Sequence, residues 1–256
     1  MKIKELIDKI NEGAVVGADT CDGIKAGSES NEIKKAGVSM FATVDVIKQA
    51  AADGVNFLIV HEPVYYDALG NFDPTPVTTA KRALIEEKGI TVYRYHDHAH
   101  FRDADLITHS ECMLLGIKGN IRKTEYLASY LIDADEPISG DDLIKRAKEQ
   151  AGIKWARLSG SRNKPCKKIA LCFGTPAGVF ELLKMPDVDM VITGEICEWA
   201  LGEYARDADA LDFTKSLAVL GHIGSERHAM KRLAEIIKND YPDLPVKYYE
   251  CGEVYI

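Results

Sequence analysis

The sequence predicts an α/β fold, because apolar segments typical of buried strands alternate with helical segments along most of the chain. Val55–Val60 is an unbroken apolar run, which is typical of a strand covered on both faces. Phe41–Glu62 also resembles Phe173–Glu195, since each has Phe-x-Thr, a helix, and an apolar strand ending in a polar turn. This weak internal repeat favours two similar lobes, and 256 residues suffice for two small domains.

The individual elements follow from apolar patterning and from signals at their ends. We expect helices at 1–10, 45–53, 78–88, 104–115, 139–151, 196–206 and 225–239. We expect strands at 38–44, 55–60, 90–95, 169–173, 188–193, 216–220 and 246–250. Gly54 and Gly89 end two of these helices, and Ser139 caps a third. We place the lobes at residues 1–120 and 121–256, with the final segment packing back on the first lobe.

The composition excludes several classes of function. The formal charge is −8, and no Lys/Arg cluster offers the cationic surface that nucleic acid or an anionic membrane needs. No apolar run approaches the roughly 18 residues of a membrane span. The residues therefore favour a soluble protein of the reducing cytoplasm, with free thiols and no C-x-x-C pair. The cysteines are Cys21, Cys112, Cys166, Cys172, Cys197 and Cys251.

Histidines and carboxylates gather where three of the expected strands end. The three clusters are His61-Glu62-Pro63, His96-Asp97-His98-Ala99-His100, and Gly221-His222 with Glu226 four residues further on. Each cluster alone has a simpler interpretation: a surface ion pair, a solvated extended face, and a helix cap. Their coincidence favours a metal site, because imidazole with carboxylate is the ligand set of Zn, Mn, Fe, Co or Ni.

The number and the positions of these ligands add two expectations. There are too many for one tetrahedral ion, whereas two ions that share a bridging carboxylate would use them all. Open α/β sheets carry their sites at the carboxyl ends of strands, so we expect the site in the cleft between the lobes.

These motifs resemble the Nif-three-like dinuclear metal-centre family, many members of which are named GTP cyclohydrolase I type 2. The resemblance covers nearly the whole chain. It rests on His61-x-Pro63, His96 with a ligand four residues later, Thr193-Gly194-Glu195, and Gly221-His222-x-x-x-Glu226. It implies two α/β lobes, two divalent transition-metal ions in the cleft between them, and a toroidal homohexamer.

Two positions depart from the family pattern. The family has His-His-Pro where this chain has Glu62 in the middle, and it has aspartate where this chain has His100. The two changes together preserve three imidazoles and two carboxylates, so we interpret the site as a variant dinuclear centre. The expected metal ligands are His61, Glu62, His100, His222 and Glu226, with His96 as a further candidate.

Other polar residues are expected around these ligands. His96, Asp97, His98 and Glu195 are candidates to orient the imidazoles, and His98 and Glu195 are also the candidate proton carriers. His98 is equally a candidate ligand in an altered geometry. Glu195 has the alternative role of a favourable charge at a helix N-terminus. His109 lies inside an expected helix and is expected to be structural or exposed.

Three further features are expected to carry no chemistry. His228 is expected to be structural or exposed, and Gly174–Gly178 is expected to be a tight turn. Gly17–Gly37 reads as a mobile loop over the mouth of the site or as a subunit contact.

The leading interpretation is a metal-dependent hydrolase of a small, nucleotide-like or phosphorylated substrate. The resemblance suggests purine ring opening. The alternative is a non-catalytic protein that stores, delivers or senses metal, or a regulatory scaffold, since the same ligands serve both roles. A third interpretation is an assembly protein with a degenerate site, for which Glu62 and His100 are the evidence.

Overall fold

A computed structural model describes residues 1–255 and divides them into two compact units. The first unit is Met1–Leu106 together with the segment that begins at Ala229, and the second is Ile107–His228. The boundaries fall at α5 (Leu106–Leu114) and within α9 (His222–Asp240), whereas we expected one boundary at residue 120. None of the helices described in residues 1–255 is long and apolar enough to cross a membrane.

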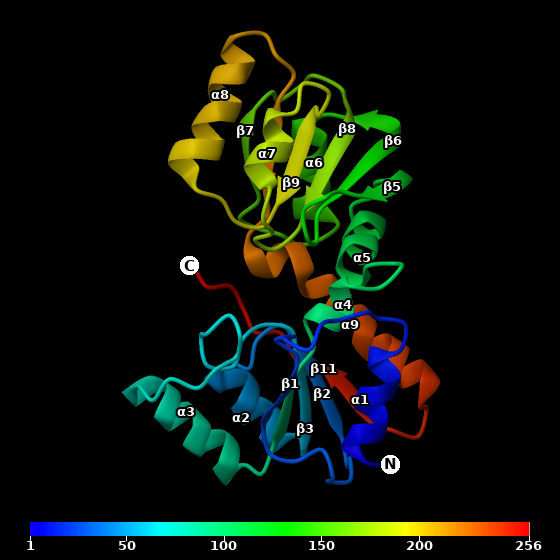
Figure 1. Cartoon of the computed structure of the whole chain (residues 1–256), viewed down its shortest axis with the longest axis vertical. Coiled ribbons are helices and arrows are strands. Elements are labelled where there is room, and N and C mark those ends of the chain that lie inside the picture. The colour runs from blue at the N-terminus through cyan, green and yellow to red at the C-terminus, as the bar shows by residue number, and fades with distance from the viewer. Residues whose placement is uncertain (256) are drawn as a thin grey trace. The chain divides into compact units, whose positions relative to one another are not determined.

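The first unit is built on a five-stranded sheet with the strand order β1-β4-β3-β2-β11. Neighbouring strands are parallel except β1, which is antiparallel to β4. The strands are β1 (Gly23–Ala26), β2 (Ala36–Ser39), β3 (Phe57–Val60), β4 (Thr91–Arg94) and β11 (Val246–Tyr248). The helices before α5 are α1 (Ile3–Asn11), α2 (Val44–Ala52), α3 (Pro76–Glu87) and α4 (Asp97–His100). Figure 1 shows α2 and α3 on one side of this sheet and α1 on the other.

The core of the first unit follows from the buried strands. All four residues of β3 are buried, and alternate side chains point to opposite faces of the sheet. Leu58 and Val60 pack in one cluster with Ile47 of α2 and Ile85 of α3. On the other face, α1 buries the stripe Ile3, Leu6, Ile7 and Ile10.

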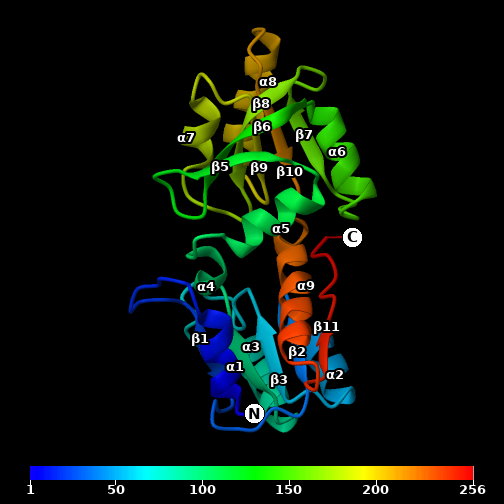
Figure 2. The same ribbon diagram turned by 90° about the vertical axis from the view of Figure 1, so that its right-hand side faces the viewer.

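The second unit contains a six-stranded sheet with the order β5-β6-β8-β9-β10-β7. Its three central strands β8, β9 and β10 are parallel, and the other three pair antiparallel. The strands are β5 (Gly119–Lys123), β6 (Tyr130–Ile138), β7 (Arg157–Gly160), β8 (Cys166–Cys172), β9 (Met190–Thr193) and β10 (Ser216–Val219). The helices are α6 (Gly140–Glu149), α7 (Val179–Lys184), the π-helix η1 (Glu198–Gly202) and α8 (Glu203–Ala210). Figure 2 shows α6 and α7 on opposite sides of the sheet.

The two units share a topology that agrees with the internal repeat. In the first unit β2, α2, β3, α3 and β4 form three adjacent parallel strands with their crossover helices. In the second unit β8, α7, β9, α8 and β10 do the same. Both times an antiparallel strand, β1 or β7, pairs with the last strand of the three. The α/β class and two similar lobes are therefore confirmed.

Several local expectations were wrong. The Gly17–Gly37 segment is not only a loop, because β1 lies within it and pairs with β4. The residues that follow β4 form one helical turn, α4, rather than an extended segment. The antiparallel strands β5, β6 and β7 were not expected. They are short or half exposed, and β6 contains Pro137, so they lack the apolar run of a fully covered strand.

Candidate metal centre

In the first unit, the ends of two parallel strands bring His61 and His96 together. The backbone N–H groups of His61 and Glu62 both donate to the carbonyl of Met40, which closes the end of β3 onto the segment after β2. The rings of His61 and His96 stack, with centroids 4.5 Å apart and an interplanar angle of 28°. Adjacent parallel strands end at the same sheet edge, which explains why residues 35 positions apart meet here.

The single turn of α4 adds a third imidazole. His96 is the N-cap of α4 and His100 is its last residue, so the two side chains lie four positions apart on one face. The centroid of the His100 ring lies 4.9 Å from that of His96 and 5.3 Å from that of His61. One potential ligand atom from each of the three residues lies within 4.8 Å of the others.

Asp22 explains why four residues hold a helical turn. Its carboxylate accepts hydrogen bonds from the backbone N–H groups of His96, Asp97 and His98, at 2.6, 2.9 and 2.9 Å. It also accepts from the Nδ1 atom of His98 at 2.6 Å. A carboxylate at a helix N-terminus satisfies donors that have no partner within the helix. Asp22 therefore fixes the turn that presents His96 and His100.

The three imidazoles have their tautomers set by oxygen acceptors at Nδ1. The Nδ1 atom of His61 donates to the Tyr95 carbonyl at 3.0 Å. The Nδ1 atoms of His96 and His100 donate to carboxylates, Asp97 at 2.9 Å and Asp105 at 3.2 Å. A proton on Nδ1 leaves the lone pair on Nε2. This is the arrangement by which proteins orient metal-binding histidines.

Burial keeps His61 neutral. Its side chain is fully buried, and burial followed by the nearby His96 imidazole holds the pKa of His61 well below the ordinary value of 6.5. The neighbouring Glu62 carboxylate acts in the opposite direction but does not prevail. Glu62 is itself buried, with the Arg94 guanidinium 3.9 Å from its carboxylate. A neutral imidazole is the form that binds a metal.

Asp97 accepts several hydrogen bonds from the segment before β1. It accepts hydrogen bonds from the Thr20 hydroxyl at 2.7 Å and from the backbone and thiol of Cys21 at 3.1 and 3.4 Å. Burial alone would raise the pKa of Asp97, but the hydrogen bonds from His96, Thr20 and Cys21 outweigh it and hold this pKa well below its ordinary value. Burial raises the pKa of the Cys21 thiol to about 12, so this thiol is a hydrogen-bond donor.

In the second unit, His222 lies between two carboxylates. Its Nδ1 atom is 2.8 Å from Glu195, which follows β9, and its Nε2 atom is 3.3 Å from Glu226. His222 and Glu226 share one face of the first turns of α9, because the helix begins at His222 itself. Glu226 is buried, whereas Glu195 has 55% of its side chain exposed. Glu195 therefore bonds to the His222 ring on the side that is exposed to solvent.

Two glycines make room for this second cluster. A Cβ on Gly174 would lie 2.4 Å from the Glu226 carboxylate, and Gly174 has a φ of +68°. A Cβ on Gly194 would lie 2.6 Å from both the Gly174 carbonyl and the Ser225 hydroxyl. The turn expected at Gly174–Gly178 therefore closes against the His222 and Glu226 turn, and no larger residue fits at these two positions.

The remaining histidines have different surroundings. The Nδ1 atom of His98 donates to Asp22 at 2.6 Å, and His98 is not part of the group formed by His61, His96 and His100. His228 contacts the buried Glu111 of α5, with its backbone N–H donating at 3.1 Å and its Nδ1 atom 3.5 Å away. His109 of α5 is partly buried. His98, His109 and His228 thus stand outside the two ligand clusters.

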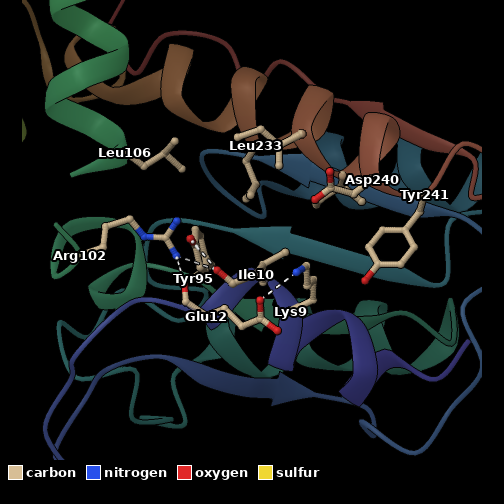
Figure 3. Close-up of a pocket in the computed structure, with 11 residues that line it drawn as sticks. Lys9, Ile10, Glu12, Tyr95, Arg102, Leu106, Leu233, Asp240 and Tyr241 are labelled. Atoms are coloured by element: carbon tan, nitrogen blue, oxygen red, sulfur yellow. Dashed lines mark hydrogen bonds and ion pairs between the residues drawn. The ribbon is translucent and has the colours of Figure 1, made fainter. Parts of the chain in front are cut away.

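A cavity of about 210 Å³ lies next to residues 96–100 of the first unit, with the flanking residues Tyr95 and Arg102 in its wall. Figure 3 shows Ile10 of α1, Leu233 of α9 and the ring of Tyr95 in its wall. Tyr95 contacts both the cavity and the imidazole group, because its hydroxyl donates to the Ile10 carbonyl while its own carbonyl accepts from Nδ1 of His61. Arg102, also in the wall, donates to the carbonyls of His98 and Ile10. These bonds hold the ends of α1 and α4 together.

The structure thus brings the expected ligands together in two sets. His61, His96 and His100 converge in the first unit, with Glu62 beside His61. Glu195, His222 and Glu226 converge in the second. Sequence reasoning missed Asp22, Asp105 and Cys21. Their only sequence signal was their residue type, because their roles depend on contacts that cross between segments.

Two α/β units with imidazoles and carboxylates at the ends of parallel strands define a protein with the donor set of a transition-metal site. The chain belongs to the Duf34/NIF3 (NGG1p interacting factor 3) family, whose sequence model matches residues 1–252.

Individual relatives agree with this membership. The chain is 26% identical to a GTP cyclohydrolase 1 type 2 homolog of Campylobacter jejuni, over 93% of each chain. It is 22% identical to the NGG1-interacting factor 3 of Saccharomyces cerevisiae, over 82% of this chain and 78% of the relative. The solved structure of the protein ybgI, described as of unknown function, covers 99% of both chains at 19% identity with a TM-score of 0.80. This last likeness supports the fold.

Proposed function

We propose that the protein binds two divalent transition-metal ions per chain and hydrolyses a small substrate in the cytoplasm. His61, His96 and His100, with Glu62 beside them, would hold metal in the first unit. His222 and Glu226 would hold metal in the second. The observation that carries the proposal is the convergence of three imidazoles, each with an oxygen acceptor at Nδ1. By the family resemblance we also propose a homohexamer.

The donor set favours Zn, Mn, Fe, Co or Ni over calcium, which prefers an all-oxygen cage. Ions of this class act as Lewis acids and supply a nucleophile at neutral pH. His61 and His100 are buried and shielded from water, while His96 is 28% exposed and Glu195 is 55% exposed. The two ligand sets therefore each have one open side on which a substrate can bind.

We assign proton transfer to Glu195. Its carboxylate is exposed and bonded to His222, so it can exchange a proton with solvent and with a bound substrate. His98, the other candidate, has its Nδ1 atom bonded to Asp22 and supports the α4 turn instead. The relatives named GTP cyclohydrolase 1 type 2 homologs make purine nucleotides the first substrates to test.

A non-catalytic metal-binding role is the second candidate. The burial of His61, Glu62 and His100 favours it, because structural metal sites are closed to solvent. Glu195 distinguishes the hydrolase from the metal carrier experimentally. A hydrolase needs its carboxylate, whereas a carrier needs only the ligands.

The first experiment is elemental analysis of protein purified without added metal or chelator. We expect about two transition-metal ions per chain in the wild type and a loss of about one in His61→Ala or His222→Ala. His109→Ala, which removes a histidine outside both clusters, is the matched control. Wild-type protein that holds no metal, even after incubation with Mn, Fe or Zn, would refute metal binding.

The second experiment decides between hydrolase and carrier. Metal-loaded wild type and Glu195→Gln are assayed against purine nucleotides with equal metal content. A hydrolase should lose turnover by about 100-fold or more in the variant, as is usual for a general acid or base. Absence of turnover by the wild type would favour the carrier.

A further inference from the structure

A second group of potential ligands lies beside the imidazoles of the first unit. Cys21, His96 and Asp97 each offer one ligand atom within 4.8 Å of the others. Within residues 1–255, no other group of three such side chains includes a cysteine. The group contains sulfur, which the imidazole and carboxylate sets lack.

Strand pairing explains why these residues meet. Cys21 lies two residues before β1, and His96 lies two residues after β4. The two strands are antiparallel, with Gly23 opposite Arg94, so the entry to one adjoins the exit from the other. The encounter is therefore fixed by the sheet rather than by a flexible loop.

The contacts within the group converge on one oxygen. Oδ1 of Asp97 lies 2.9 Å from Nδ1 of His96 and 3.4 Å from Sγ of Cys21. Cys21 is 8% exposed, whereas the side chains of Asp97 and His96 are 17% and 28% exposed. Sγ of Cys21 and Nδ1 of His96 thus both contact Oδ1 of Asp97, and the partly exposed side chains of His96 and Asp97 leave this position accessible to water.

We propose that Cys21, His96 and Asp97 form a thiolate-containing site for a borderline-soft divalent cation such as Zn²⁺ or Co²⁺. Thiolate, imidazole and carboxylate are all zinc ligands, and three protein ligands leave a fourth position for water. On binding, the S–H bond of Cys21 and the Nδ1–H bond of His96 both break heterolytically, and each electron pair forms a bond to the cation. The thiol proton leaves to solvent, and the His96 ring takes up a proton at Nε2 in place of the one lost from Nδ1, so the ring stays neutral. No oxidation or reduction takes place.

His96 connects this site to the imidazole set. Its Nδ1 atom faces Asp97, and the same residue belongs to the group with His61 and His100. The inference rests on the proposed function only through this shared residue, since Cys21 and Asp97 lie outside the ligand sets proposed above. Occupation of the thiolate site replaces the hydrogen bond that orients His96 and moves the ring proton to Nε2, so the two sites compete for one ring.

Cobalt provides a direct test, because a thiolate ligand gives Co²⁺ a near-ultraviolet charge-transfer band that imidazole and carboxylate ligands do not. Metal-free wild-type protein is titrated with Co²⁺, and both this band and the visible bands are recorded. We expect the charge-transfer band in the wild type and its loss in Cys21→Ser, with one fewer Co²⁺ bound per chain. Cys197→Ser, which alters an exposed cysteine of the second unit, should keep the band.

The outcomes separate the two proposals. Visible bands without a charge-transfer band in the wild type would overturn the thiolate site and leave the imidazole set standing. A charge-transfer band that persists in Cys21→Ser would also overturn it. No cobalt binding by the wild type would contradict both proposals, and this result needs no variant to fold.

Discussion

The histidines of the first unit show how identical side chains acquire different roles. His96, His98 and His100 alternate in the sequence, but the rings that contact His61 are those of His96 and His100. His98 instead shares the Asp22 carboxylate with the backbone of the α4 turn. All three Nδ1 atoms bond to carboxylates, which orient the rings, and contact with the His61 ring distinguishes the two candidate ligands from His98.

Asp105 provides a test of this principle for His100. We expect Asp105→Asn to weaken metal binding in the first unit by about 10- to 100-fold, because the neutral amide orients the imidazole less firmly and lowers its basicity. The affinity is measured by competition with a chromophoric chelator. Asp103→Asn, an exposed aspartate two residues away, is the control. Equal affinities for Asp105→Asn and wild type would show that the 3.2 Å contact with His100 does not matter for binding.

At the scale of elements, α3 is tied to the segment that follows His61 and Glu62. The ammonium of Lys81 on α3 donates to the Val64 carbonyl at 2.6 Å and lies 4.7 Å from the centre of the Tyr66 ring. Lys81 is only 5% exposed, and burial lowers its pKa from 10.5 to about 8. This contact between Lys81 and Val64, the Lys81 anchor, therefore holds the ammonium group in a buried place where its charged form is disfavoured.

This anchor gives the stability a distinct pH dependence. Between pH 8 and 10.5 the unfolded chain holds a proton on Lys81 that the folded chain releases, so stability rises with pH in this window. Relative to Lys81→Met, which cannot titrate, the wild type should gain about 2 kcal/mol between pH 7 and pH 9.5. Urea denaturation of both proteins at the two pH values measures this difference. Lys48→Met, at an exposed position on α2, should show no comparable change.

At the scale of the whole molecule, the same topology occurs twice with different chemistry at its strand ends. The first unit carries three imidazoles after β3 and β4, and the second carries one imidazole between two carboxylates after β9 and β10. Each unit has its own hydrophobic core. The folded state alone assembles either ligand set, so metal should bind the native chain in preference to the unfolded one.

Metal should therefore raise the melting temperature. Free metal at about 100 times its dissociation constant stabilises the native state by about 2.7 kcal/mol, or roughly 5 to 10 °C for a chain of this size. Calorimetry with Zn²⁺ and with a chelator measures the shift. The double variant His61→Ala with His222→Ala should lose most of this shift and keep only what the Cys21, His96 and Asp97 group contributes. A wild type insensitive to both additions would argue against binding at either set.

Local patterns in the sequence determined much of this protein. The apolar run of β3, the glycine that ends α2, and the helix cap at Ser139 all act through neighbours in the chain, so they are legible without a structure. The same holds for the His222 and Glu226 pair, because helical spacing places positions four apart on one face. These signals predicted the α/β class and most candidate ligands.

Only the tertiary structure decided the rest. Asp22 caps α4 from 75 residues away, and Cys21 meets Asp97 across the β1 and β4 pair. The short, half-exposed strands β5 and β7 pair with partners whose positions no local pattern specifies. Long-range contacts depend on how the whole chain packs, and the residue types that make them carry no periodic signal. The sequence by itself therefore determined which residues are candidate ligands, and the fold decided which of them meet and which oxygen acceptor orients each ring.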